Sequence, residues 1–139
     1  MSDCIFCKII NEEMPSAKVY EDEHVYAFLD ISQVTKGHTL VIPKAHAENI
    51  YELTPDVAAN LFSVVPKIAN ALKKAYNPSG LNIVNNNGKT AGQTVFHYHL
   101  HLIPRYGEND GFDAIWKQNT DQYTQEDLQN IAQTIAKQL

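Results

Sequence analysis

Basic residues are scarce in this sequence. It has 11 lysines and arginines against 16 aspartates and glutamates, a net charge of −5, and no lysine- or arginine-rich run. A protein that binds a nucleic acid polymer needs a basic surface to neutralise the phosphates. The composition therefore argues against a polynucleotide partner, although it leaves room for a small nucleotide at a local site.

Long apolar runs and cysteines are also scarce. No stretch approaches the roughly 18 apolar residues that a membrane span requires, and the first residues, Met1 to Asp3, lack the pattern of a signal peptide. The two cysteines, Cys4 and Cys7, are too few for a disulfide framework. We expect a cytoplasmic protein with no membrane contact.

The length and the hydrophobic periodicity predict one α+β domain. A chain of 139 residues is within the usual size of a single domain and can bury a real core. Helices are predicted at 4–10, 54–76 and 124–139, and strands at 17–21, 24–30, 37–43, 81–85 and 95–103. Short strands joined by polar turns favour an antiparallel sheet of about five strands, with the long helix on one face.

The most informative stretch is 95–103. Its alternating members are three histidines, His97, His99 and His101, and four apolar residues, Phe96, Tyr98, Leu100 and Leu102. This period of two predicts a half-buried strand with the apolar side chains in the core and the imidazoles on the other face. At a rise of about 3.3 Å per residue, His97 and His101 are roughly 13 Å apart, so the three rings cannot easily converge on one metal ion. They can instead line a groove about as long as a phosphate with its flanking groups; the alternative is a solvated strand face.

Cys4 and Cys7 have the Cys-x-x-Cys spacing that is common in half of a tetrahedral zinc site. The spacing also fits two reduced thiols with His97 hydrogen-bonded nearby. A redox pair is expected after a strand in a βαβ unit, and only three residues precede Cys4. On spacing alone, all three interpretations remain open.

The segment from His97 to Ile103 resembles the H-x-H-x-H-x-x motif of the histidine triad (HIT) superfamily of nucleotide hydrolases and transferases. The likeness extends to 28–31, 37–44 and 92–95, and it is strongest to the small, single-domain phosphoramidase-like branch. The resemblance implies one HIT domain over 1–139. Its core would be about 4–106, with an extension at 107–139 that carries the terminal helix.

The resemblance also implies a mechanism. His99 matches the family nucleophile, which attacks the α-phosphorus of a nucleotide and forms a nucleotidyl-histidine that water then cleaves. A neutral imidazole is a good nucleophile near neutral pH. Its other ring nitrogen needs an acceptor, for which a backbone carbonyl is the usual candidate. His101 and His38 match the flanking histidines that contact the phosphate oxygens and the leaving group, and no metal is required for this chemistry.

Other positions match the family's nucleotide-binding residues. Asp30 matches the acid that accepts hydrogen bonds from the ribose hydroxyls; taken alone, its position favours a turn-initiating aspartate at a strand end. The base-pocket positions, which are also good core residues, are Ile5, Phe6, Phe28 and Ile31. The positions near the sugar and phosphate are Asn86, Gly92, Gln93 and Thr94.

Some HIT relatives close a zinc site on the two cysteines with two histidines. One follows the Pro-Lys segment and the other is the first histidine of the triad, and these positions match His46 and His97. The resemblance therefore implies a Cys2His2 site formed by Cys4, Cys7, His46 and His97. Four protein ligands make such a site closed and structural.

Relatives of this branch are homodimers whose two sheets join into one, so we expect the same here. The expected activity is hydrolysis of purine nucleoside phosphoramidates of the AMP-amine type. The motif does not separate this activity from dinucleoside polyphosphate hydrolysis or nucleotidyl transfer, because only the leaving group differs. Two other classes stay open: a metal-dependent hydrolase liganded by the three histidines, which the strand spacing opposes, and a nucleotide-binding scaffold with incidental catalysis.

Overall fold

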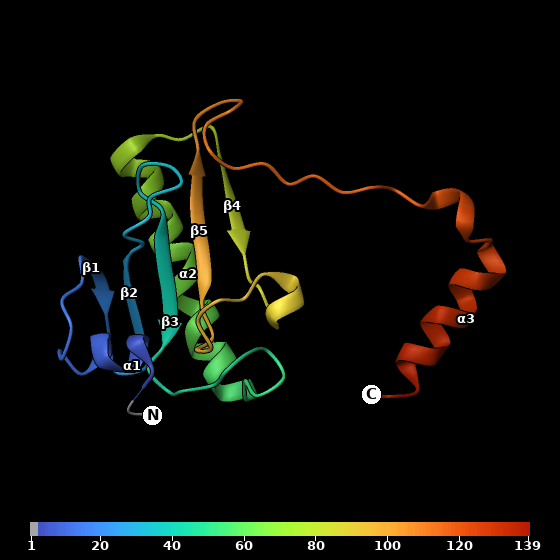
Figure 1. Ribbon diagram of the computed structural model, residues 1–139, viewed down its shortest axis with the longest axis horizontal. Coiled ribbons are helices and arrows are strands. Elements are labelled where there is room, and N and C mark those ends of the chain that lie inside the picture. Colours follow the sequence, from blue (N-terminus) through green and yellow to red (C-terminus); the bar gives the residue numbers. More distant parts are fainter. Residues whose placement is uncertain (1–2) are drawn as a thin grey trace.

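A five-stranded antiparallel sheet forms the centre of the protein (Figure 1). The computed structural model describes residues 3–139. The strands are β1 (Lys18–Glu21), β2 (Val25–Leu29), β3 (Thr39–Pro43), β4 (Gly80–Val84) and β5 (Leu100–Arg105). Their order is β1-β2-β3-β5-β4, and every neighbouring pair is antiparallel. The predicted α+β class with five strands is confirmed.

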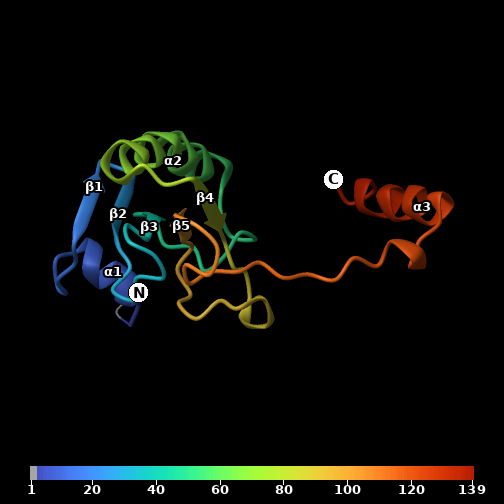
Figure 2. The same cartoon turned by 90° about the horizontal axis from the view of Figure 1, so that it is seen from above.

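The long helix α2 (Pro55–Tyr76) covers one face of the sheet (Figure 2). It begins where the sequence predicts, because Thr54 Oγ1 accepts a hydrogen bond from Val57 N (3.3 Å) and Pro55 occupies the first turn. The buried stripe of α2 is Leu61, Val64, Val65, Ile68 and Leu72. This stripe packs against inward-facing residues of β2, β3 and β5 and makes the larger half of the core.

The short helix α1 (Ile5–Ile10) lies on the opposite face. Cys4 is its N-cap residue, and Phe6 and Ile9 are its buried side chains. They pack against a second cluster that includes Phe28 and Leu40. Because β2 and β3 are covered on both sides, they are buried along nearly their whole length and show no inside-outside alternation.

The predicted strand at 95–103 is wrong in its first half, because β5 begins only at Leu100. Val41 pairs with Leu100, so continuing the ladder would place Tyr98 opposite Pro43. Proline has no N–H to donate, and the ladder stops there. Tyr98 N instead donates to the carbonyl oxygen of Ala47 (2.7 Å), in the segment that follows β3.

Because the backbone differs from the predicted strand, the exposure of Phe96 and the end of the strand also differ from prediction. Phe96 is 44% exposed instead of belonging to the core, whereas Tyr98, Leu100 and Leu102 are buried as predicted. At its other end β5 continues through Pro104, which pairs with Leu81 of the neighbouring β4. The alternation therefore identified the buried face correctly but misplaced the strand by several residues.

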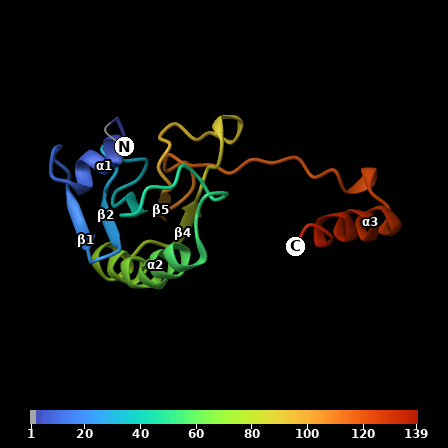
Figure 3. The same cartoon turned by 90° about the horizontal axis from the view of Figure 1, so that it is seen from below.

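After β5 the chain leaves the body as an extended arm that ends in helix α3 (Gln125–Ala136) (Figure 3). Thr124 and Asp127 form a reciprocal capping box at its start, so the predicted terminal helix is confirmed. Every residue from 113 to 139 is exposed. Within residues 3–139, none of the helices combines the length and the hydrophobicity needed to cross a bilayer.

Candidate active site

Three histidines and an aspartate meet on the face of the sheet that α2 does not cover. His38 precedes β3, and Asp30 follows β2. His99 comes directly before β5, and His101 is the second residue of that strand. The imidazoles reach this face because the intervening Leu100 points the other way, into the core beneath α2. The ring of His101 lies 5.1 Å from that of His99 and 5.2 Å from that of His38.

The ring of His99 is held in one tautomer. Its Nδ1 lies 2.7 Å from the carbonyl oxygen of His97 and must donate, since a carbonyl can only accept. The predicted backbone acceptor is thus present. Nε2 is left without a proton and free to act as an acceptor or nucleophile.

Hydrogen bonds also fix the tautomers of His38 and His101. Val34 N donates to His38 Nδ1 (3.3 Å), so the proton of His38 is on Nε2. That nitrogen donates to His101 Nδ1 (2.9 Å), which leaves the proton of His101 on its own Nε2. The pair therefore presents one N–H donor beside the basic nitrogen of His99.

All three rings are kept neutral. The pKa of His101 falls to about 4, mainly because the ring is buried and also because His99 and His38 lie close, while Asp30 acts in the opposite direction. Burial also lowers the pKa of His99 and of His38, again against the carboxylate of Asp30. Neutral imidazoles are the forms that can attack phosphorus or donate without carrying charge.

The carboxylate of Asp30 serves two functions. Oδ1 accepts from Ser32 N (2.8 Å), which is the turn-forming role of an aspartate after a strand. Oδ2 lies 3.6 Å from His38 Nε2 and 4.0 Å from His101 Nδ1. One oxygen therefore closes the turn while the other faces the histidine pair.

A cavity of about 460 Å³ opens beside these rings. Its apolar wall comes from α1, the following loop, and the ends of β2 and β3. The predicted residues that line it are Ile5, Phe6, Phe28, Asp30, Ile31, Thr94, His99 and His101. The ring centroid of Phe6 lies 5.2 Å from that of His99 and 5.4 Å from that of Phe28, edge to face in both pairs. The side chain of Phe6 therefore links the apolar wall to the imidazole.

The loop before the histidine segment carries four predicted nucleotide-binding residues, and one of them lines the cavity. Thr94 lines it, whereas Asn86, Gly92 and Gln93 are not among the lining residues. Gln93 is 3% exposed, and its amide accepts from Gly88 N and donates to two carbonyl oxygens, those of Glu48 and Val95. In this structure Gln93 braces the loop from inside.

Two features were missed from the sequence. Asn85 Nδ2 donates to the carbonyl oxygen of His99 (2.9 Å) and so fixes the backbone of that residue. The segment 14–16 after α1 adds Met14, Pro15 and Ser16 to the cavity wall. Pro15 is the one sequence signal that the chain turns back toward the cavity after α1. The segment 14–16 has no hydrophobic periodicity and belongs to no motif.

Cys4, Cys7, His46 and His97 form a separate cluster in which one ligand atom from each residue lies within 4.8 Å of the others. His97 Nδ1 lies 3.4 Å from Cys4 Sγ, and His46 Nδ1 lies 3.4 Å from Cys7 Sγ. Tetrahedral zinc with sulfur and nitrogen ligands places neighbouring donor atoms roughly 3.4 to 3.8 Å apart. The donor set and its spacing therefore fit zinc.

Burial of this cluster favours the neutral thiol of Cys7 unless a cation is bound. Burial, and then the neighbouring Cys4, raise the pKa of the Cys7 thiol to about 11, and a bound cation would favour the thiolates instead. His97 Nε2 donates to the carbonyl oxygen of Pro43 (2.8 Å), which leaves Nδ1 as the ligand atom.

The three triad histidines do not share one ligand group. His97 belongs to the cysteine cluster and His101 to a second group with Asp30 and His38, whereas His99 is in neither among residues 3–139. In the second group, His38 Nε2 and His101 Nδ1 already bond to each other. The geometry thus gives no support to a metal centre liganded by the three triad histidines together.

An antiparallel α+β domain that places an H-x-H-x-H segment beside an apolar cavity, with its central imidazole neutral and oriented by a backbone carbonyl, defines a histidine triad protein. The comparison with known families agrees with this class. The chain belongs to the HIT family, because the model of the HIT domain matches residues 11–108.

Three curated relatives show the range of the family. Protein hit of Bacillus subtilis is 66% identical over 137 residues, with 99% of this chain and 94% of that protein covered. Adenylylsulfatase HINT3 of Arabidopsis thaliana is 46% identical over 115 residues, 83% of this chain and 56% of that protein. Adenosine 5'-monophosphoramidase HNT1 of Candida albicans is 40% identical over 119 residues, 83% of this chain and 78% of that protein.

Solved structures share the fold over nearly the whole chain. The crystal structure of a HIT family protein from Bacillus anthracis is 68% identical, with a TM-score of 0.97 and coverage of 99% and 97%. That of a Bacillus subtilis HIT family member is 66% identical, with a TM-score of 0.96 and the same coverage. A zinc-bound histidine triad protein from Mycobacterium smegmatis is 34% identical, with a TM-score of 0.75 and coverage of 96% and 98%.

Proposed function

We propose that this protein is a nucleotide hydrolase that cleaves purine nucleoside phosphoramidates of the AMP-amine type through a covalent intermediate on His99. One observation carries the proposal: His99 Nδ1 donates to the carbonyl oxygen of His97, which leaves Nε2 unprotonated beside a cavity of about 460 Å³. The names of the Candida and Arabidopsis relatives, a monophosphoramidase and an adenylylsulfatase, both specify an adenylyl substrate.

The chemistry follows from the three ring tautomers. His99 Nε2 attacks the α-phosphorus, a phosphorus–nitrogen bond to the ring forms, and the bond to the amine breaks. His101 Nε2–H donates a hydrogen bond to the leaving nitrogen while its Nδ1 accepts from His38, and the nitrogen departs as the amine with a proton from solvent. Water then attacks phosphorus, the bond to His99 breaks, and the proton of that water returns to solvent.

We assign the nucleotide to the cavity in the orientation that the lining residues favour. The base would lie against Phe6, Phe28 and Ile31, and the ribose hydroxyls would donate to Asp30. The phosphate would then approach Thr94 and the loop residues, which are Asn86, Gly92 and Gln93. Gly92 has a φ of +95°, so a side chain there would strain this loop.

We further propose structural zinc and a homodimer. Cys4, Cys7, His46 and His97 would hold the zinc, which would tie α1 to the histidine segment and supply no Lewis acid to the reaction. The dimer would form through the outer edge of β4, which ends the sheet, and would extend the sheet across both copies. The cytoplasmic location and the absence of nucleic acid polymers among the partners stay predictions.

Intact mass after a rapid quench tests the reaction. With an AMP phosphoramidate we expect turnover to AMP and a transient adduct of one AMP on the chain. Adenylyl sulfate and a dinucleoside polyphosphate are the matched substrates, because they share the adenylyl group and differ only in the leaving group. Turnover confined to the polyphosphate would replace the phosphoramidate assignment. Binding of AMP without turnover of any of the three would favour a scaffold protein.

Protonation of His101 is expected to contribute to the loss of activity at low pH. Its folded pKa of about 4 is below the ordinary value of 6.5, so the ring stays neutral as the pH falls through 6 and gains a proton only near 4. Protonation of Nδ1 would break the hydrogen bond from His38. We expect kcat/KM to keep its neutral-pH value below the ordinary histidine pKa of 6.5 and to fall at lower pH as His99 and His101 gain protons.

The variant Asp30→Asn supplies the control for this profile. The carboxylate raises the pKa of His101, so its removal is expected to move the acid limb to lower pH. Circular dichroism at each pH separates loss of activity from unfolding. A wild-type limb centred near 6.5 would contradict the neutral, buried pair.

A further inference from the structure

Three consecutive asparagines, Asn85, Asn86 and Asn87, follow β4 and lie outside any helix or strand. The proposed nucleotide site uses only Asn86. The side chains of the other two are half-buried, and neither lines the cavity. Asn85 nevertheless bonds to the nucleophile His99, so this pair of asparagines has a role that the mechanism above does not include.

The two side chains form a continuous chain of hydrogen bonds that ends on His99. The backbone N–H of Ile50 donates to Asn87 Oδ1 (2.7 Å), and Asn87 Nδ2 donates to Asn85 Oδ1 (2.7 Å). Asn85 Nδ2 then donates to the carbonyl oxygen of His99 (2.9 Å). A backbone N–H can only donate and a carbonyl oxygen can only accept, so the two ends of the chain allow one orientation of both amides. Aligned amides of this kind strengthen one another.

The far end of the chain is anchored in the segment that follows β3. The carbonyl oxygen of Ala47 accepts from Tyr98 N (2.7 Å), in the histidine segment. The carbonyl oxygen of Glu48 accepts from Gln93 Nε2 (2.6 Å), in the loop before it. Ile50 belongs to the same short segment, so the chain of amides starts from backbone that other contacts already hold.

The near end supports His99 at a point where the sheet does not. His99 comes one residue before β5, and the ladder between β4 and β5 ends at the pair of Val84 and His101. The donor from Asn85 holds the carbonyl group of His99 beyond that last pair. The ring is held separately, through Nδ1, by the carbonyl oxygen of His97. One bond on the backbone and one on the ring therefore fix where Nε2 points.

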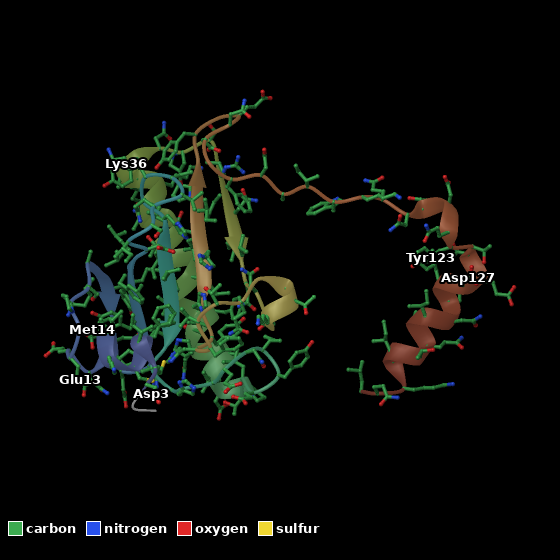
Figure 4. The ribbon with its side chains drawn as sticks, in the orientation of Figure 1. Asp3, Glu13, Met14, Lys36, Tyr123 and Asp127 are labelled. Atoms are coloured by element: carbon green, nitrogen blue, oxygen red, sulfur yellow. The ribbon has the colours of Figure 1, made fainter. Side chains whose placement is uncertain are left out.

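The chain of amides reaches His99 from the β4 side, away from the apolar wall of the cavity. Met14, which belongs to that wall, lies on the α1 side of the body in Figure 4. The loop that follows β4 lies across β5 from it in Figure 1. Loss of these amides is therefore expected to move the nucleophile and to leave the apolar wall in place.

We propose that Asn85 and Asn87 form an amide relay, the chain from Ile50 N to the carbonyl group of His99, which positions the nucleophile. Both are positioning residues, because they bond to His99 or to each other and not to the substrate. The proposal rests on the covalent reaction proposed for His99 and adds to it the support of the attacking atom. Displacement of a reacting group by about 1 Å can cost on the order of 10²-fold in rate, so partial loss of this support is expected to cost roughly tenfold.

Removal of the donor tests the near end of the relay. Asn85→Leu keeps the approximate shape of the side chain without a charge, but it cannot donate to His99. In single-turnover experiments with an AMP phosphoramidate, we expect the rate of adduct formation to fall about tenfold, while the dissociation constant for AMP, measured by calorimetry, stays within about twofold. A loss confined to AMP affinity would place Asn85 in nucleotide binding and overturn the proposal.

Asn70→Leu is the matched control. Asn70 Nδ2 also donates to a backbone carbonyl oxygen, that of Pro66 (2.9 Å), but on the exposed face of α2. This variant is expected to keep both quantities within about twofold of wild type. Equal behaviour of Asn85→Leu and Asn70→Leu would contradict a positioning role.

A double-mutant cycle tests whether the two asparagines act in series. Asn87→Leu leaves the donor of Asn85 in place but frees its amide to turn, so the rate of adduct formation is expected to fall by a smaller factor. If the relay acts as a unit, the double variant is no slower than Asn85→Leu alone. Effects that multiply would mean two independent contacts and no relay. Where Asn85→Leu fails to fold, Asn87→Leu alone decides, and a wild-type rate in that variant would refute the relay.

The ring proton of His99 separates positioning from the proposed function. In protein labelled with ¹⁵N-histidine, the Nδ1–H of His99 is the ring signal that disappears in His99→Ala. In Asn85→Leu that is folded by circular dichroism, we expect this proton to exchange faster with water, and an unchanged exchange rate would overturn the proposal. If wild type cleaves neither the AMP phosphoramidate nor adenylyl sulfate nor the dinucleoside polyphosphate, the proposed function fails, whereas this signal still decides whether the relay holds His99.

Discussion

Replacement of His99 by alanine is expected to lower kcat/KM for an AMP phosphoramidate by on the order of 10³-fold or more, and to abolish the adduct of one AMP. The reason is the loss of the only triad ring whose Nδ1 is fixed on a backbone carbonyl and whose Nε2 is free beside the cavity. Neither neighbour substitutes for it. His38 and His101 hold each other through Nε2 and Nδ1, and the His101 nitrogen left over carries a proton.

His101→Ala is the matched control, because it removes a partly buried imidazole from the same segment without removing the nucleophile. It is expected to slow release of a poor leaving group while still allowing the AMP adduct to form. AMP affinity measured by calorimetry should change by only a few fold in both variants, since the cavity wall from Phe6 to Phe28 is retained. A His99→Ala protein that still forms the adduct would place the nucleophile elsewhere.

Replacement of Cys7 by alanine is expected to remove one zinc ion per chain and to lower Tm by roughly 10 °C, the equivalent of a few kcal/mol in a domain of this size. Cys7 Sγ lies 3.4 Å from His46 Nδ1 and 3.6 Å from His97 Nδ1, so its loss removes a ligand that bridges both histidines. These contacts connect α1 to the segments after β3 and before β5. Activity is expected to fall as well, because the carbonyl group of His97 orients His99.

Metal analysis and thermal unfolding of Cys7→Ala, with Lys8→Ala as the control in the same helix, check this prediction. Lys8→Ala changes α1 without touching the cluster, so it should keep its zinc and lose little stability. Chelation of wild type should lower Tm toward that of Cys7→Ala, and added zinc should restore it. Wild type that purifies without metal and gains no stability from zinc would leave the cluster as two thiols beside histidines.

The sequence identified the active-site histidines because their spacing and their apolar neighbours are local properties. Tyr98, Leu100 and Leu102 are buried, and the imidazoles of His99 and His101 face the other way, as a period of two requires. The helix starts at Thr54 and Thr124 were likewise visible, since a cap depends on residues three positions apart. The HIT-type motif added the order in which these pieces occur.

Partners far apart in the sequence were decided by the tertiary structure. Asn85 reaches the carbonyl group of His99 because β4 lies beside β5, and no local pattern in the sequence indicates that pairing. Gln93 is turned inward because Gly88 and the carbonyl groups around it satisfy its amide. The strand at 95–99 failed for the same reason, since it depends on Pro43 from another strand.

By itself, then, the sequence determined which face of each element is apolar, where the helices begin and which residue types gather near the histidines. These are consequences of side-chain spacing along one segment. The tertiary structure alone decided which ring nitrogens carry protons, because each tautomer is set by a contact that packing supplies: a carbonyl group for His99, and Val34 for His38. It also decided that α3 stands apart from the sheet. The sequence of an amphipathic helix does not show whether its apolar stripe is covered by its own chain or by another.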